Sequence, residues 1–177
     1  SDNLDVAQFA CGVINNLAMA LDNCVPLVRD AVVEGVVVDA LLAHVDDKVL
    51  AVVACRALWF LAKANANRVP MERAGAGLAL VAALRDHASD ADVASFACGA
   101  LLCLAAADDN KVPLVQSDGA GAALVAARIA RPRDLQVARD MCRALNHLAM
   151  VSENQVPLVR DNGVGSALAA ALVEHTG

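Results

Sequence analysis

The sequence predicts an all-α fold, an α-solenoid in which short helical units of nearly equal length are stacked in one row. Two features are the basis of this prediction. The motif Asn-x-Val-Pro occurs four times at intervals of 44, 43 and 44 residues, beginning at Asn23, Asn67, Asn110 and Asn154. Of the 177 residues, 58% are hydrophobic but only 2% are aromatic, which is typical of helices packed closely through small side chains. A period of this length indicates one structural unit stacked on copies of itself.

Each unit is predicted to contain three helices. The first is short and starts at the Asn-x-Val-Pro motif, because Asn caps helices and Pro is tolerated in a first turn. A glycine then breaks the chain, at Gly35, Gly75, Gly119 and Gly163. The second helix, for example 76–85 or 164–174, ends near a cation that the helix dipole favours. These cations are His44, His87, Arg131 and His175.

A polar turn leads into the third and longest helix, predicted at 4–20, 48–63, 91–106 and 134–150. In every copy, apolar residues recur at helical spacing around a repeated cysteine, which is Cys11, Cys55, Cys98 or Cys142. They lie four residues before this cysteine and three, six and seven residues after it. This stripe is therefore predicted to be buried.

The predicted units form a single array. Residues 1–22 are the third helix of a partial repeat, 23–66, 67–109 and 110–153 are complete repeats, and 154–177 are the first two helices of another partial repeat. The units alternate between two types, because the segment 5–12 recurs 87 residues later at 92–99 with one substitution, and 55–58 recurs unchanged at 142–145.

Neither end of the array has a distinct polar capping repeat, although solenoids normally require one. We therefore expect that the chain belongs to a longer array or that its ends pair with other molecules. Apolar helix faces around Val6, Leu17, Leu168 and Leu172 would be exposed at the two ends. An end-to-end homo-oligomer is accordingly the alternative, structural interpretation of the chain.

Charge and hydropathy argue against several classes of protein. The net charge of −6 disfavours nucleic-acid binding, which usually needs a basic face. No stretch of about 18 apolar residues is free of charge, so no membrane span is predicted. The polar start of the chain, from Ser1 to Asn3, does not resemble a signal peptide.

The six cysteines are predicted to be free thiols. The four repeated cysteines occupy equivalent positions on neighbouring helices, which lie about 10 Å apart. A disulfide needs Cα atoms within about 7 Å, and no Cys or His spacing is typical of zinc. We therefore expect neither metal nor cofactor. Reduced thiols in this number indicate a cytoplasmic protein, with the nucleus as the alternative compartment.

Comparison of the four third helices also identifies variable positions. At −3, +1, +4, +5 and +8 from the repeated cysteine the residue type changes freely, and these positions lie along one side of the helix. Four cations and no acid occupy these 20 positions, although the chain has 20 acids against 14 Lys and Arg. We interpret this stripe as an exposed partner-binding face; the alternative is a merely solvated face with Trp59 partly folded into the core. The candidate residues are Asn15, Asn16, Arg56, Trp59, Phe60, Lys63, Arg139, Arg143, Asn146 and His147.

The repeat resembles the armadillo repeat. The resemblance rests on the pattern Ala-x-Gly-Ala-Leu-x-x-Leu-Ala at 97–105, followed by Asn110, Val112, Leu114, Gly119 and Leu124, and it recurs in every unit. HEAT repeats share the period, but three helices per unit and the glycine break favour armadillo. The resemblance implies a right-handed superhelix whose third helices line a concave groove that holds extended peptides or partner proteins.

The family's peptide-binding signature is only partly present. Its Asn five residues after the cysteine position is matched by Asn16, but the other units have Phe60, Cys103 and His147 there. Nuclear-import receptors of the family also need acids near the groove to bind basic cargo, and this stripe has none. An importin-like transport adaptor is therefore the less favoured alternative function.

The leading hypothesis is a non-catalytic scaffold that binds an extended or helical partner segment carrying acidic and apolar residues. Arg56, Arg139 and Arg143 would bind carboxylates or phosphates, and Trp59 and Phe60 would anchor apolar groups. No catalytic motif is present. Cys103 and His147 share the stripe in adjacent units, but helices about 10 Å apart and the lack of an orienting group argue against a catalytic pair. Asp140 replaces an apolar residue of the other units, and pairing with a nearby arginine is the one role that the sequence suggests.

Overall fold

A computed structural model of the chain describes residues 2–30, 32–160 and 162–175. These residues form helices and turns and no strand, so the all-α prediction is confirmed. The first helices are α2 (Leu21–Arg29), α5 (Arg68–Arg73), α8 (Lys111–Gln116) and α11 (Ser152–Arg160). The second helices are α3 (Val33–Ala43), α6 (Ala76–His87), α9 (Ala120–Ala130) and α12 (Val164–His175). The third helices are α1 (Asp2–Ala18), α4 (Lys48–Ala62), α7 (Ala91–Ala105) and α10 (Leu135–Leu148).

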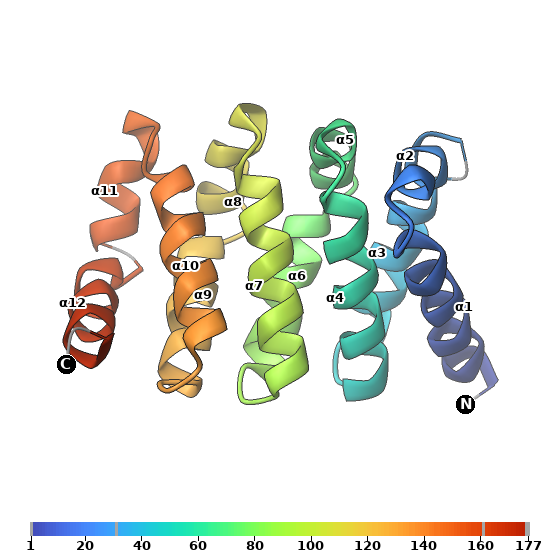
Figure 1. The fold of residues 1–177 in the computed structure, drawn as a ribbon, viewed down its shortest axis with the longest axis horizontal. Helices are drawn as coiled ribbons and strands as arrows, with labels where there is room; N and C mark the ends of the chain where they lie inside the picture. The colour runs from blue at the N-terminus through green and yellow to red at the C-terminus, as the bar shows by residue number, and fades with distance from the viewer. Residues whose placement is uncertain (1, 31, 161, 176–177) are drawn as a thin grey trace.

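The helices are arranged as a row of repeating units (Figure 1). The third helices lie side by side, with α4 packed between α1 and α7, and α7 packed between α4 and α10. The second helices form a row behind them, and the first helices lie across one end of each unit (Figure 1). We call the outward surface of α1, α4, α7 and α10 the third-helix face. The two chain termini lie at opposite ends of the row (Figure 1).

Three of the third helices begin at an aspartate in the predicted polar turn. The side chain of Asp90 accepts hydrogen bonds from the backbone of Asp92 and Val93, and Asp47 and Asp134 cap α4 and α10 in the same way. An acidic cap satisfies backbone donors that a helix start leaves unpaired. The third helices therefore begin and end within two residues of the predicted bounds.

The repeated asparagine stands at the predicted helix start in two units, immediately before α5 and α8, but its side chain makes no capping hydrogen bond there. The first helix or a 3₁₀ turn already begins two residues before the asparagine, at Leu21 in α2 and at Asn65 in η1 (Asn65–Asn67). The turn η2 (Asp108–Asn110) and α11 repeat this arrangement. The side chain of Asn67 makes no hydrogen bond to the start of α5. It is buried, and its amide group donates hydrogen bonds instead.

These bonds form a ladder along the row, which we call the asparagine ladder. Nδ2 of Asn67 donates to the Leu61 carbonyl near the end of α4, at 2.9 Å, and to the Cys24 carbonyl of the preceding unit, at 2.8 Å. Asn110 bonds Leu104 and Arg68 in the same way, and Asn154 bonds Leu148 and Lys111. The acceptor in the preceding unit is always the residue after that unit's own asparagine. Each amide thus pairs with a carbonyl at the C-terminal end of a third helix and also joins two units.

We predict that Asn110→Ala lowers the free energy of unfolding by about 2–3 kcal/mol, because two buried hydrogen bonds are lost and their acceptors stay buried. The matched control is Asn23→Ala, since Asn23 is exposed and donates only to Leu17, within its own end of the row. Urea denaturation followed by circular dichroism measures both. Equal losses in the two variants would contradict the ladder.

The predicted chain break is correct in three units and misplaced in one. Gly75, Gly119 and Gly163 have φ of +88°, +77° and +64° and immediately precede the second helix. Gly35 lies inside α3, and Val32 takes the left-handed position with φ of +53°. A β-branched residue is disfavoured there, so Val32 adopts this conformation against its local preference.

The second helices end at the predicted cations, and two of these cations contact the preceding unit. Nε2 of His87 lies 2.7 Å from the Val45 carbonyl oxygen, and because a carbonyl only accepts, this nitrogen carries the proton. Nη1 of Arg131 donates to the Ser89 carbonyl at 3.2 Å. The side chain of His175 lies outside the described part. These contacts join neighbouring units through their second helices.

The repeated cysteines lie in the apolar core, as predicted from their spacing. Cys11, Cys55 and Cys98 are buried and Cys142 is half-buried, and all six cysteines are free thiols. Burial raises the pKa of Cys11 to about 11 and that of Cys55 to about 12. The core thiols are therefore protonated and act as small apolar side chains.

Candidate functional site

The centre of the third-helix face holds a cluster of aromatic rings. Trp59 and Phe60 follow each other on α4, with ring centroids 5.0 Å apart, and Phe96 of α7 lies 5.7 Å from Trp59. All three are half-buried. Tilted rings at these distances attract each other beyond simple apolar contact. The cluster thus joins two units and keeps part of its apolar surface open to solvent.

A glycine on α7 makes room for the tryptophan. A Cβ atom at Gly99 would lie 2.8 Å from Nε1 and 3.0 Å from Cδ1 of Trp59. The ring therefore lies directly on the backbone of α7, where no other residue type leaves space. Trp59 is half-buried and packs against the hydrophobic core, as the alternative interpretation of this stripe expected for this residue.

Two cations lie on the aromatic rings. Nζ of Lys63 is 3.7 Å from the centroid of Trp59 and 4.3 Å from that of Phe60, and Cζ of Arg56 is 5.8 Å from that of Phe96. Cation–π contacts of this kind contribute about 0.5–1 kcal/mol at exposed sites. They hold positive charge beside the open edge of the cluster.

Next to this cluster is a cavity of about 290 Å³ between α4, α7 and α10. Its lining includes three basic side chains, Arg68, Arg143 and His147, and one acidic side chain, Asp140, together with apolar residues. We call it the third-helix cavity. Its lining consists of Trp59, Arg68, Gly99, Leu102, Cys103, Ala106, Gln136, Asp140, Arg143 and His147.

Asp140 does not pair with an arginine, contrary to the suggestion from sequence. It is buried, and its Oδ2 accepts a hydrogen bond from Nε2 of Gln136 at 2.8 Å, one turn earlier on α10. Among the described residues it forms no ion pair. Arg143 likewise forms none, so its exposed guanidinium is available to a ligand.

The ten predicted site residues fall into three groups. Arg56, Trp59, Phe60 and Lys63 form the aromatic and cationic cluster. Arg143 and His147 line the third-helix cavity with Trp59. The remaining four lie toward the ends of the row: Asn15 and Asn16 on α1, and Arg139 and Asn146 on α10.

The expectation that Asn15 is exposed is wrong. Its side chain is buried and takes part in two hydrogen bonds. Nε of Arg56 donates to Asn15 Oδ1 at 2.9 Å, and Asn15 Nδ2 donates to Asn16 Oδ1 at 3.0 Å. Asn15 therefore orients Arg56 on the face of α4. Asn16, Lys63, Arg139, Arg143 and Asn146 are exposed, and Arg56 and His147 are half-exposed.

Sequence reasoning missed two contributors to the site. Arg68 reaches the cavity from the start of α5, and Phe96 completes the aromatic cluster. The variable positions described above all lie on third helices. Arg68 lies at a variable position of the first helices, which is occupied by Cys24, Lys111 or Gln155 in the other units. Applying the same comparison to the first helices would have identified Arg68.

Cys103 and His147 both line the cavity. Burial raises the pKa of Cys103, and Arg68, Lys63 and Arg143 lower it only in part. A nucleophilic thiol requires the opposite shift. In that part of the chain, no three His, Cys, Asp or Glu side chains are placed to hold a metal ion.

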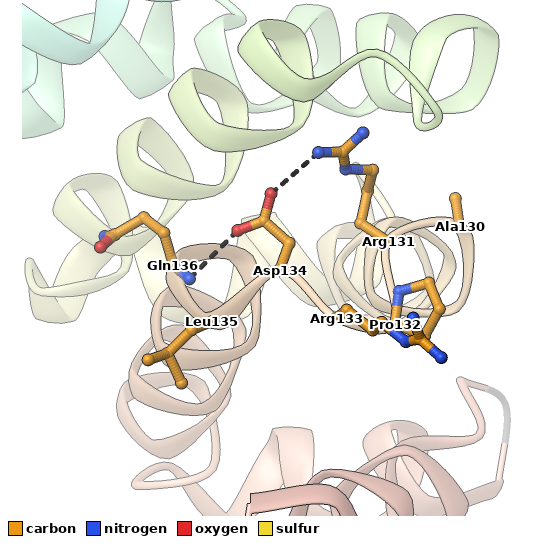
Figure 2. Close-up of a pocket in the computed structure, with 7 residues that line it drawn as sticks. All are labelled: Ala130, Arg131, Pro132, Arg133, Asp134, Leu135 and Gln136. Carbon is orange, nitrogen blue, oxygen red and sulfur yellow. Dashed lines mark hydrogen bonds and ion pairs between the residues drawn. The ribbon is translucent and has the colours of Figure 1, made fainter.

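A larger hollow, of about 620 Å³, lies at the turn between α9 and α10 (Figure 2). Figure 2 shows Asp134 between the guanidinium of Arg131 and the backbone of Gln136, to which it is bonded. The lining is formed by the seven consecutive residues 130–136 alone. Since no other element contributes a side chain, we do not regard this hollow as the functional site.

A pair of acids lies between two units, away from the third-helix face. Oε2 of Glu72 and Oδ2 of Asp118 are both buried, and the two carboxyl groups lie close enough to share one proton. Both approach Gly77, where a Cβ would lie 2.7 Å from Glu72 Oε2. Burial, and then the neighbouring Asp118, raise the pKa of Glu72 to about 8. Two acids alone do not define a binding site, but they make stability depend on pH.

We predict that the free energy of unfolding falls as pH rises from about 4.5 to about 8. The folded state keeps the Glu72 proton across this window while the unfolded chain loses it, so raising pH favours unfolding. Glu72→Gln should make this pH-dependent decrease in the free energy of unfolding smaller by about 1–3 kcal/mol. Urea titrations at pH 5 and pH 8.5 measure it, with the exposed Glu153→Gln as control. A Gln variant with unchanged pH dependence would refute the assignment.

We also predict that Gly99→Ala displaces Trp59, shifts its fluorescence and lowers stability by about 1–3 kcal/mol, because the added methyl overlaps the ring. Gly12→Ala is the matched control, since Gly12 occupies the same repeat position and a Cβ there meets nothing within 4 Å. Trp59 is the only tryptophan, so its emission spectrum reports the site directly. Identical spectra for Gly99→Ala and the unchanged protein would contradict this packing.

Among the described residues, no single helix is long and apolar enough to cross a membrane; two helix pairs meet that test only together, and each is bent by more than 110°. Comparisons with protein-family models, curated proteins and solved structures found no match to this chain.

Proposed function

We propose that this chain is an armadillo-type α-solenoid that acts as a non-catalytic scaffold. Its third-helix face binds an extended or helical protein segment that presents an acidic group beside an apolar one. The observation that carries the proposal is the third-helix cavity, in which Arg68, Arg143 and His147 surround space next to the open edge of Trp59. Bidentate donors beside an aromatic ring suit a carboxylate followed by an apolar side chain.

The armadillo assignment is supported by the order of helices. Three helices per unit, a left-handed residue before the second helix and a row of third helices recur along the chain. The resemblance in sequence would make this row the concave side of a right-handed superhelix. A groove of that kind would direct a bound segment across several third helices.

Charge supports an acidic partner. The chain has a net charge of −6, yet the exposed cations Lys63, Arg139 and Arg143 lie on one face, and the cavity on this face has Arg68, Arg143 and His147 against one acid, the buried Asp140. A local field of opposite sign to the whole protein selects and orients an acidic ligand. The six free thiols favour a reducing compartment, so we propose the cytoplasm or nucleus as the location.

The test is titration of the protein with an acidic and apolar peptide, such as one alternating Glu or Asp with Leu or Phe, followed by Trp59 emission. We expect saturable binding, and a peptide with Lys in place of the acids should not bind. Arg143→Glu should weaken binding about tenfold or more, since each charge-assisted contact contributes about 1.5–3 kcal/mol. Arg133→Glu is the control, because it makes the same charge change at an exposed site in the α9–α10 turn.

Unchanged Trp59 emission at millimolar peptide would refute the proposal. Equal weakening by Arg143→Glu and Arg133→Glu would also refute it, because that result would indicate binding through overall charge and not through the cavity.

A further inference from the structure

We infer that the acidic group which the third-helix cavity binds most tightly is a phosphate on the partner segment, carried by a phosphoserine or phosphothreonine next to an apolar residue. This inference rests on the proposed function, because it names the ligand chemistry of the same site. Three features of the cavity favour phosphate over carboxylate: the number of cations around it, the free nitrogens of two arginines, and the positive charge that remains uncompensated.

Three cations surround one thiol of the cavity. Burial raises the pKa of Cys103, and three nearby cations lower it in part; they are Arg68, Lys63 and Arg143. Against them, Asp140 is the one acid among the lining side chains, and it is buried. The excess of two positive charges is close to the charge of about −1.5 to −2 that a phosphate carries at pH 7. A carboxylate would leave one of these positive charges uncompensated.

The fold does not need the charge of Arg68. Its Nε donates to the Ala62 carbonyl at 3.2 Å. In two other units an uncharged side chain at this repeat position bonds the equivalent carbonyl: Gln155 donates to Ala149 at 3.3 Å, and Cys24 donates to Ala18 at 3.2 Å. The Nε bond fixes the direction of the guanidinium, and its two terminal nitrogens bond nothing else among the described residues. Arg68 therefore holds two donors in place for a ligand.

Arg143 is free of the contacts that hold Arg56 at the same repeat position. Arg56 donates to Asn15 and lies over Phe96. In the helix before Arg143, the position of Asn15 is taken by Leu102, whose side chain cannot accept a hydrogen bond. Arg143 is exposed, and its guanidinium lines the same cavity of about 290 Å³ as that of Arg68. Two guanidinium forks from different units can thus share one tetrahedral phosphate.

The apolar surface beside the cations favours a phosphate attached to a protein segment over free phosphate. Trp59 lines the same cavity and keeps part of its ring open, and Leu102 and Ala106 add apolar lining. Inorganic phosphate would leave this surface exposed to water, whereas a phosphorylated residue next to Leu or Phe would cover it. Phosphorylation of the partner would then control its binding to the third-helix face.

The test uses three peptides that differ at one position, where Ser, Glu or phosphoserine stands immediately before a Phe. Binding is followed by Trp59 emission. We expect the phosphoserine peptide to bind about tenfold or more tightly than the Glu peptide, because it accepts further charge-assisted hydrogen bonds. An isomer with the phosphoserine moved to the far end of the peptide has the same net charge and should bind no better than the Ser peptide. Inorganic phosphate should compete only at much higher concentration than the phosphopeptide.

Two variants test whether the phosphate binds in the cavity. Arg68→Gln should keep the bond to Ala62, as Gln155 does in its own unit, and Arg143→Gln changes an exposed side chain. Both should therefore keep the circular dichroism spectrum of the unchanged protein. Each should bring the Kd of the phosphoserine peptide close to that of the Glu peptide. Arg133→Gln is the matched control, because it makes the same change at an exposed site in the α9–α10 turn and should leave the preference intact.

Equal affinity for the Glu and phosphoserine peptides would overturn this inference and leave the proposed function standing. Tight binding of the positional isomer, or an unchanged preference in both cavity variants, would also overturn it, because the phosphate would then bind elsewhere. Inorganic phosphate that competes at the same concentration as the phosphopeptide would show that the apolar neighbour plays no part. Unchanged Trp59 emission with every peptide would refute the proposed function itself, and this inference with it.

Discussion

The asparagine ladder is the constraint on which the rest of the structure depends. Third helices end in carbonyl groups that the helix itself cannot satisfy, and these ends are buried between units. The Nδ2 groups of Asn67, Asn110 and Asn154 each bond one such carbonyl and one carbonyl of the preceding unit. Because an unpaired buried amide is costly, each unit fits its neighbour in one register, and the third helices lie parallel in a row.

That register determines which surface remains available for function. Neighbouring units cover most of each third helix and leave one outward stripe. On this stripe, residues from different units meet only because stacking places them together: Trp59 lies on Gly99 of the next unit, and the cavity beside it combines Arg68 with Arg143. Asp140 is the one acid among the side chains that line this cavity. A repeated framework thus carries a non-repeated site at its centre.

The same register has a consequence at the ends of the row. A unit is stable when its three helices cover one another and its asparagine bonds the unit before it. At the two ends of the described row, Val13 and Val159 are exposed, whereas Ala57 and Val115 at the same repeat positions are buried. The interior site and the exposed ends therefore follow from one stacking geometry.

The sequence by itself determined the helical class, the period, the bounds of the third helices and the cations that end the second helices. These features follow from local rules: apolar spacing along a helix, aspartate caps and a repeat visible in the chain. Only the tertiary structure decided the role of the repeated asparagine, the left-handed Val32, the burial of Asn15 and the Gln136 partner of Asp140. Most of these depend on residues about 40 positions apart that meet across a unit boundary, or on a backbone conformation that packing imposes against local preference. Local pattern indicates which residues could form such contacts, but stacking selects the partners.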